Sequence, residues 1–263
     1  MTFMDVHTHA FHPKIADKVL SQLEAHYGIL PVGNGLVEDL LARLDRAGID
    51  QAVVHTAATD AAQVIPANNW ALSLQAGYDG RIRAFGTMHP DYPEPEKELA
   101  RIARKGIKGL KFHNDFQGFP MDDPRLVDIL ALAGDRFAIM FHVGDRHAPE
   151  QNPSCPMKMA ALHERFPDLP MIVAHLGGYL HWKWALDCLV GTGVYLDTSS
   201  SLAFIDDETL KTIFARHPRE RILFGSDYPL FDPADEAWKL QKRLNLTDSE
   251  LEDILANGAR LLG

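Results

Sequence analysis

The stretch Met171-Ile172-Val173-Ala174-His175 is a short apolar run that ends in a histidine, and segments with helical spacing flank it on both sides. Residues from Met157 to Phe166 precede it, and residues from Leu180 to Leu189 follow it. An apolar run of this length between two helices predicts a buried strand, and strands separated by helices are typical of a parallel sheet.

The same alternation continues in both directions along the chain. The predicted strands are Asp5 to His9, Gln51 to His55, Ile82 to Met88, Ile107 to Phe112, Phe137 to Val143, Met171 to His175, Gly193 to Asp197 and Arg221 to Asp227. The predicted helices are Leu36 to Leu44, Glu94 to Arg104, Pro124 to Leu132, Met157 to Phe166, Leu180 to Leu189, Thr209 to His217, Pro233 to Leu244 and Ser249 to Leu262. Eight such strands in 263 residues favour an α/β fold, a single (β/α)8 TIM barrel with its active site at the C-terminal mouth of the strands.

An open doubly wound sheet is the alternative fold, but no glycine-rich phosphate loop follows the first strand. Nothing marks an internal boundary, so we expect residues 1–263 to form one domain. Two long irregular segments, from Ala10 to Gly35 and from Gly144 to Pro156, are expected to lie over the mouth as lids.

The composition excludes several classes of function. A formal net charge of −10 argues against nucleic-acid binding through a broad basic surface, and against a nuclease. The two cysteines are too few for a disulfide framework, and the start of the chain does not resemble a secretion signal. No apolar run approaches the roughly 18 residues of a membrane span. We therefore expect a cytoplasmic protein.

Histidines gather at the ends of the predicted strands. Seven of the 13 histidines lie on or just after a strand end: His7, His9, His55, His89, His113, His142 and His175. Asp197 and Asp227 end the last two strands. Because parallel strands of a barrel end at one mouth, these side chains should converge there. Each histidine alone is more simply a hydrogen-bonded polar residue at the rim, but together they favour a site for zinc or a similar divalent metal.

Several of these segments resemble the metal-dependent amidohydrolase superfamily, in particular its amidohydrolase-related (amidohydrolase 2) branch. The resemblance covers nearly the whole chain. It rests on Asp5-Val6-His7-Thr8-His9, Gly109-Leu110-Lys111-Phe112-His113, Phe141-His142-Val143-Gly144, Ala174-His175-Leu176-Gly177-Gly178, Leu223-Phe224-Gly225-Ser226-Asp227-Tyr228-Pro229 and Asn257-Gly258-Ala259-Arg260-Leu261-Leu262.

This resemblance implies a metal site with named ligands. His7 and His9 hold the metal, and His142 is a further ligand. Asp227 acts as ligand and as proton acceptor, while His175 ligates the metal or polarises the substrate. Zinc is the expected metal, with manganese as an alternative.

Lys111 and His113 follow as candidate substrate-binding residues on the fourth strand. Some binuclear relatives carry a carbamylated lysine that bridges two metals at a similar place. The alternative, which we favour slightly, is that Lys111 binds a substrate carboxylate, with Arg146 as a second cation for the same purpose.

We expect the protein to be an enzyme, a hydrolase that uses metal-activated water on an amide, lactone or ester of a small molecule. The alternative is a metal-dependent, non-oxidative decarboxylase of an aromatic or unsaturated carboxylic acid, and a noncatalytic metal-binding or ligand-binding barrel is a third hypothesis. The expected partners are a small, carboxylated substrate and a second copy of the chain in a homodimer.

Overall fold

The computed structural model describes residues 1–263, the whole chain. Eight strands alternate with helices, and every strand pair is parallel. The strands are β1 (Met4–Thr8), β2 (Gln51–Val54), β3 (Ile82–Ala84), β4 (Gly109–Phe112), β5 (Ala138–Phe141), β6 (Met171–Val173), β7 (Tyr195–Asp197) and β8 (Ile222–Leu223). The predictions of an α/β fold and of eight parallel strands are confirmed.

The strands form two sheets that are hydrogen-bonded to each other at both edges. One sheet has the order β1-β2-β3 and the other the order β4-β5-β6-β7-β8. Parallel bridges join Thr8 to Tyr228 and Gly86 to Leu110. The Val6 amide also donates to the Phe224 carbonyl at 2.8 Å, so β1 is paired with the segment that follows β8.

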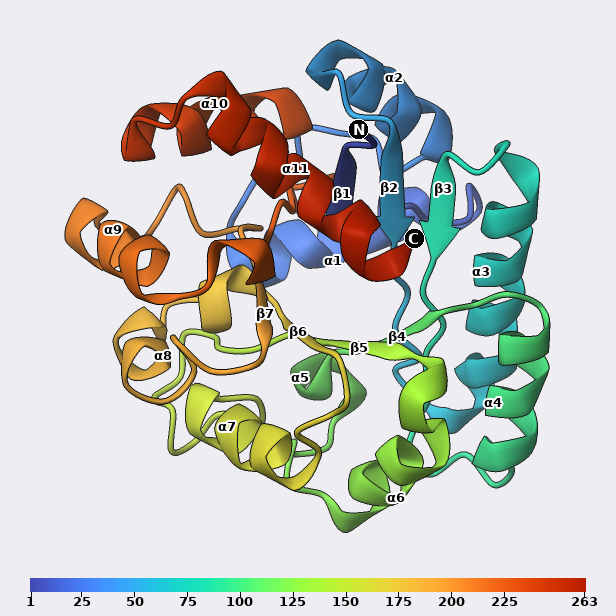
Figure 1. Ribbon diagram of the computed structural model, residues 1–263. Coiled ribbons are helices and arrows are strands. Elements are labelled where there is room, and N and C mark those ends of the chain that lie inside the picture. The colour runs from blue at the N-terminus through green and yellow to red at the C-terminus, as the bar shows by residue number, and fades with distance from the viewer.

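Helices surround the strands (Figure 1). They are α1 (Ala16–Tyr27), α2 (Val37–Ala47), α3 (Val64–Gly77), α4 (Pro95–Arg104), α5 (Asn114–Gln117), α6 (Pro124–Ala133), α7 (Pro156–Arg165), α8 (Trp182–Cys188), α9 (Asp207–Arg216), α10 (Pro233–Leu244) and α11 (Asp248–Leu262). Each predicted helix is present within two or three residues of its predicted ends. No helix has both the length and the apolar character that crossing a membrane requires.

Three helices were not predicted: the four-residue α5 and two longer ones. The segment from Ala10 to Gly35, expected to be irregular, contains α1, and the connection between β2 and β3 contains α3. Helix α1 buries only Ala16, so it lacks the apolar core face from which a helix is recognised. Helix α3 carries Pro66 and two asparagines, which are poor helix formers, and packing of Val64, Ala71 and Leu74 in the core outweighs their effect.

The β8 strand is shorter than the predicted segment from Arg221 to Asp227. The chain leaves the extended conformation before Asp227, which has a φ of 64°, and the same happens after β6, where His175 has a φ of 61°. Non-glycine residues at positive φ are strained, and such strain persists where the surrounding structure fixes the backbone. After both strands, the backbone turn therefore moves the side chains of Asp227 and His175 away from the alternating directions of strand residues.

Alternation along the strands decides which side chains point into the site. Ile139 and Phe141 of β5 belong to the large core that packs against the helices, whereas Ala138 and Met140 belong to a separate, smaller cluster. His142 continues the face of Ala138 and Met140. On β4 the residues Leu110 and Phe112 pack in the large core, and Lys111 takes the opposite face.

Candidate functional site

A cavity of about 910 Å³ lies where the strands end. Six of the seven strand-end histidines line it, as do Lys111 and Asp227: the histidines are His7, His9, His55, His113, His142 and His175. The seventh, His89, faces elsewhere and pairs its Nε2 with the Gln117 carbonyl at 3.1 Å. We call His7, His9, His142, His175 and Asp227 the floor of the cavity.

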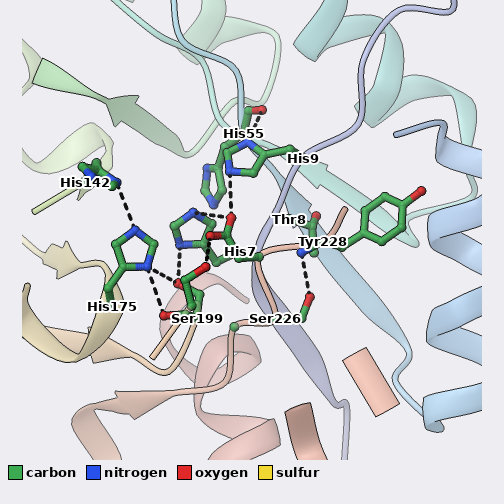
Figure 2. A network of polar contacts seen from close by, with 12 residues as sticks. His7, Thr8, His9, His55, His142, His175, Ser199, Ser226 and Tyr228 are labelled. Atoms are coloured by element: carbon green, nitrogen blue, oxygen red, sulfur yellow. Dashed lines mark hydrogen bonds and ion pairs between the residues drawn. The ribbon is translucent and has the colours of Figure 1, made fainter. Parts of the chain in front are cut away.

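Three floor residues, His7, His9 and Asp227, form a compact group. Figure 2 shows His7 and His9 side by side. Asp227 Oδ1 lies 3.2 Å from His9 Nε2 and 3.6 Å from His7 Nε2. The ligand atoms of His7, His9 and Asp227 all lie within 4.8 Å of one another. Two imidazole nitrogens and a carboxylate oxygen at this spacing are a donor set that suits zinc or manganese.

The Nδ1 atom of His7 is hydrogen-bonded in a way that fixes the ring. It lies 2.9 Å from Asp197 Oδ2 and 2.9 Å from Ser199 Oγ. Ser199 donates its own hydroxyl proton to the other carboxylate oxygen of Asp197, so Nδ1 of His7 carries the proton and donates. Nε2 of His7 therefore carries the lone pair, and it lies near Asp227 and Lys111. A carboxylate holds a metal-binding histidine through its other nitrogen in the same way.

His142 and His175 form a second pair, with rings 4.8 Å apart. His142 Nε2 donates to the Gly144 carbonyl at 2.9 Å, and His175 Nδ1 donates to the Ser199 carbonyl at 3.0 Å. The remaining nitrogens, His142 Nδ1 and His175 Nε2, face each other at 3.0 Å (Figure 2). Each ring carries its proton on its other nitrogen, so both facing nitrogens present a lone pair. Two facing lone pairs need a cation or a shared proton, so this pair also fits a metal site.

All five predicted ligands line the same cavity, but they form two groups. His142 contacts His175 and not the group of His7, His9 and Asp227. The rings of His7 and His175, 5.2 Å apart, connect the two groups. Whether one metal uses all five side chains stays a prediction.

Buried charges at the floor have shifted pKa values. Burial alone would raise the pKa of Asp227 and of Asp197, but His7 and its neighbours hold both below their usual range. Burial and the nearby Lys111 lower the pKa of His7 to about 4. At neutral pH, His7, His142 and His175 are therefore neutral imidazoles beside the ionised carboxylates of Asp227 and Asp197.

Lys111 is fully buried beside this group. Its Nζ lies 3.3 Å from His7 Nε2, and burial lowers its pKa to about 8. The placement is compatible with a substrate-binding cation and with a carbamylated bridging ligand. Arg146, the predicted second cation, does not line the cavity; its guanidinium donates to the carbonyl of Tyr27.

The wall of the cavity comes largely from α1, which sequence reasoning missed. Val19, Leu23 and Tyr27 lie one turn apart on α1 and face the cavity, and we call these three residues the α1 wall. Their spacing of four residues is a helical signal, but a weak one, because no buried core face of α1 accompanies it. The sequence analysis places Asp197 at a strand end, but its role with Ser199 in holding His7 follows only from the structure.

The remaining predicted positions have simpler roles. His55 is buried and donates from Nε2 to the Val6 carbonyl at 2.7 Å. His113 stacks on His142 with a centroid distance of 3.9 Å, and its Nε2 lies 3.2 Å from the Tyr27 hydroxyl. His26 was not predicted to belong to the site, but it lines the cavity, and its Nε2 lies 3.2 Å from Asp145 Oδ2.

Solved structures with the same fold cover nearly the whole chain. A 5-carboxyvanillate decarboxylase from Novosphingobium aromaticivorans, crystallised with manganese, is 17% identical, with a TM-score of 0.73 over 99% of this chain and 97% of that chain. A 2,6-dihydroxybenzoate decarboxylase from Rhizobium is 16% identical, with a TM-score of 0.69 over 100% and 98%. A probable 2-pyrone-4,6-dicarboxylic acid hydrolase from Acinetobacter baumannii is 14% identical, with a TM-score of 0.71 over 100% of both chains.

No curated protein sequence matches this chain significantly. At these identities the solved structures establish the fold and not the reaction. The sequence model of one enzyme family, described as amidohydrolase, matches residues 4–263 and so includes every residue of the floor. The chain therefore belongs to the amidohydrolase family.

Proposed function

We propose that this enzyme is a metal-dependent, non-oxidative decarboxylase of an aromatic carboxylic acid. The observation that carries the proposal is the contrast between an apolar, aromatic wall and a charged floor in one cavity. The reaction replaces a ring carboxylate by a proton and releases carbon dioxide, so it needs a place for a flat ring, a counter-charge for the carboxylate and a group that moves a proton.

The lining of the cavity suits a substituted benzene ring. Its aromatic residues are Phe11, Tyr27, Trp70, Phe116 and Tyr179, with aliphatic side chains between them. The volume of about 910 Å³ is at the upper end of the range for small-molecule sites. No arginine lines it, and of its two lysines Lys111 is buried at the base whereas Lys18 is exposed. A dicarboxylate substrate would leave one carboxylate without a buried counter-charge, whereas a monocarboxylic aromatic acid matches this lining.

We propose that His7, His9 and Asp227 hold a divalent metal, zinc or manganese, with His142 and His175 as further ligands. Three observations support this assignment: the lone pair of His7 Nε2, the ionised Asp227, and the two facing nitrogens of His142 and His175. A bound divalent ion supplies positive charge that orients the substrate carboxylate and lowers the energy of the negative charge that develops as carbon dioxide leaves.

Within the site, Asp227 has the position of a proton carrier. His7 and His9 favour its ionised form, which is the form that can accept a proton from a substrate hydroxyl or from water. Oδ2 of Asp227 accepts from Ser200 at 2.5 Å, so the carboxylate is fixed in orientation. Oδ1 then returns the proton to the ring carbon that has lost its carboxylate.

We propose that Lys111 binds the substrate carboxylate from the base of the cavity, and that His113 contributes to the same side of the site. With a pKa of about 8, Lys111 is mostly charged at neutral pH and can pair with an anion. A carbamate on Nζ would remove this charge. Intact-mass measurement of the native protein distinguishes the two forms by the mass of one carbon dioxide.

Hydrolysis of a lactone or ester is the second candidate, and one observation favours it. The ionised Asp227 lies 3.2 Å from His9 Nε2, where it could take a proton from an attacking water. The structural likeness to a probable pyrone hydrolase agrees with this reading. The absence of arginine from the cavity argues against a dicarboxylate, so a hydrolase of this kind would act on a less charged substrate.

We also infer that residues 1–263 form one domain in which the strands close into a (β/α)8 barrel. The bridges at both edges of the two sheets support closure, because they pair β1 with the segment after β8 and β4 with the segment after β3. The floor then sits at the C-terminal mouth, where barrel enzymes carry their sites.

Metal-stripped enzyme, reloaded with zinc or with manganese, tests the proposal on hydroxybenzoates and on lactones in deuterated water. We expect metal-dependent release of carbon dioxide, and one deuterium on the ring carbon that carried the carboxylate. A ring-opened product formed with water would establish the hydrolase instead. Activity that is unchanged by stripping the metal would contradict both candidates.

A further inference from the structure

Tyr27, the last residue of α1, places a phenol hydroxyl in the cavity, and this hydroxyl donates no hydrogen bond to the protein. The hydroxyl lies 3.2 Å from His113 Nε2, and this is its only hydrogen bond. The direction of that bond follows from the other nitrogen of His113. The Phe116 amide donates to His113 Nδ1 at 3.4 Å, so Nδ1 is an acceptor and Nε2 carries the proton.

The consequence for Tyr27 is that its oxygen accepts from His113. Its own proton has no acceptor among the side chains and carbonyls around it. A partly buried hydroxyl that accepts one hydrogen bond from the protein and keeps a proton for the cavity is suited to donate to a ligand oxygen. Burial and the negative charge of Asp227 raise the pKa of Tyr27 well above 10, so the phenol keeps this proton.

The position of this hydroxyl is fixed from several sides. His113 is sandwiched between Phe116, at a centroid distance of 4.1 Å, and His142, at 3.9 Å, with both rings nearly parallel to it. The guanidinium of Arg146 donates to the carbonyl of Tyr27, and Gly28 ends α1 in the left-handed conformation. The nearby Tyr179 hydroxyl, by contrast, makes no hydrogen bond to the protein and has no such anchor.

The chemistry of the two ends of the cavity indicates which ligand oxygen Tyr27 meets. Lys111 and the metal ligands supply charge at the floor and match a carboxylate. Tyr27 is a neutral donor on the aromatic side, where the rings of Phe116 and Tyr179 approach it edge-on at 6.1 and 6.0 Å. A neutral donor suits an uncharged oxygen on the ring.

We propose that the Tyr27 hydroxyl donates a hydrogen bond to a ring hydroxyl of the substrate and thereby sets its orientation, which makes hydroxylated aromatic acids the preferred ligands. This inference rests on the proposed function, since it takes an aromatic acid as the substrate. Tyr27 is in this sense a substrate-positioning residue of the α1 wall.

Calorimetric binding to the metal-loaded enzyme tests this without turnover. Benzoate is compared with 2-, 3- and 4-hydroxybenzoate, and with the corresponding fluorobenzoates as controls for size. We expect at least one hydroxybenzoate to bind the wild type about 5- to 10-fold more tightly than benzoate, as one neutral hydrogen bond would give. In Tyr27→Phe this advantage should fall below about 2-fold, while the affinity for benzoate stays within about 2-fold of wild type.

The matched control is Tyr195→Phe, which removes a phenol hydroxyl far from the cavity and should keep the wild-type preference. Thermal unfolding checks that Tyr27→Phe is folded, and Tyr27→Leu is a second variant without the hydroxyl. The inference is overturned if the wild type binds none of the acids or shows no preference for a hydroxyl, if Tyr27→Phe keeps the preference, or if it weakens all ligands equally.

Carbon dioxide release, measured separately, distinguishes this inference from the proposed function. A Tyr27-dependent preference in an enzyme that releases no carbon dioxide contradicts the decarboxylase and leaves the binding role intact. Release of carbon dioxide with no effect of Tyr27→Phe on binding supports the decarboxylase and contradicts the role of Tyr27.

Discussion

The floor and the α1 wall of the cavity are built in different ways. The floor side chains lie on strands that are buried on both faces or shortly after them, and hydrogen bonds to the protein hold His7, His142 and His175. The α1 wall is one face of a helix that buries only Ala16 and rests on the mouth of the site. The proposed catalytic residues therefore lie on rigid strands. The residues proposed to select the ligand lie on α1, a peripheral helix that can change without loss of the fold.

The largest effect that this comparison predicts is at Asp227. In Asp227→Asn we expect decarboxylation to fall by about 10² to 10⁴, because the amide cannot carry the proton. Turnover of the metal-loaded enzyme measures this, and metal analysis of the same sample shows whether the ion is still held.

The matched control is Asp206→Asn. Asp206 caps α9 away from the cavity, and asparagine caps helices equally well. Full activity in Asp227→Asn, with metal retained, would exclude Asp227 as the proton carrier.

The second effect concerns Asp197, which is hydrogen-bonded to His7 of the floor but is not itself a predicted metal ligand. We expect Asp197→Asn to weaken metal binding by about 10- to 100-fold, because the charge that orients His7 through Nδ1 is lost. Competition with a chelator measures the affinity. An affinity equal to that of the wild type would mean that His7 does not depend on Asp197 for its role.

The sequence predicted the floor and missed the α1 wall for a physical reason. His142 could be placed because it follows an apolar strand whose alternation points it into the cavity, and Lys111 could be placed by the same rule. Tyr27 could not, because α1 packs little surface in the core and its apolar face turns toward the cavity. The partnership of Asp197, Ser199 and His7 joins residues 190 positions apart or more, and no local pattern encodes it.

The third prediction concerns acid stability of the metal-free protein. The pKa of His7 is about 4 in the folded chain and ordinarily 6.5, so between these pH values the unfolded chain binds the proton and the folded chain does not. Unfolding free energy should therefore fall as the pH drops from 6.5 to 4, with a contribution from His7 on the order of 1 to 3 kcal/mol.

Urea denaturation of metal-free wild type and His7→Asn at pH 7 and pH 4.5 measures this contribution. We expect the variant to lose less stability on acidification than the wild type. Leu23→Ala, a change in the α1 wall, should keep the wild-type dependence on pH. Equal losses in wild type and His7→Asn would mean that the floor is not where acid destabilises the fold.

The smallest effect is expected in the α1 wall itself. Leu23 faces the cavity and is only partly buried, so Leu23→Ala should lower the free energy of unfolding by less than about 1 kcal/mol. Leu40 of α2 is fully buried in the large core, and the matched Leu40→Ala should cost about 2 to 5 kcal/mol. Urea denaturation at pH 7 compares the two. A loss at Leu23 as large as that at Leu40 would mean that α1 is part of the core of the fold, and the division between a rigid floor and a replaceable wall would not hold.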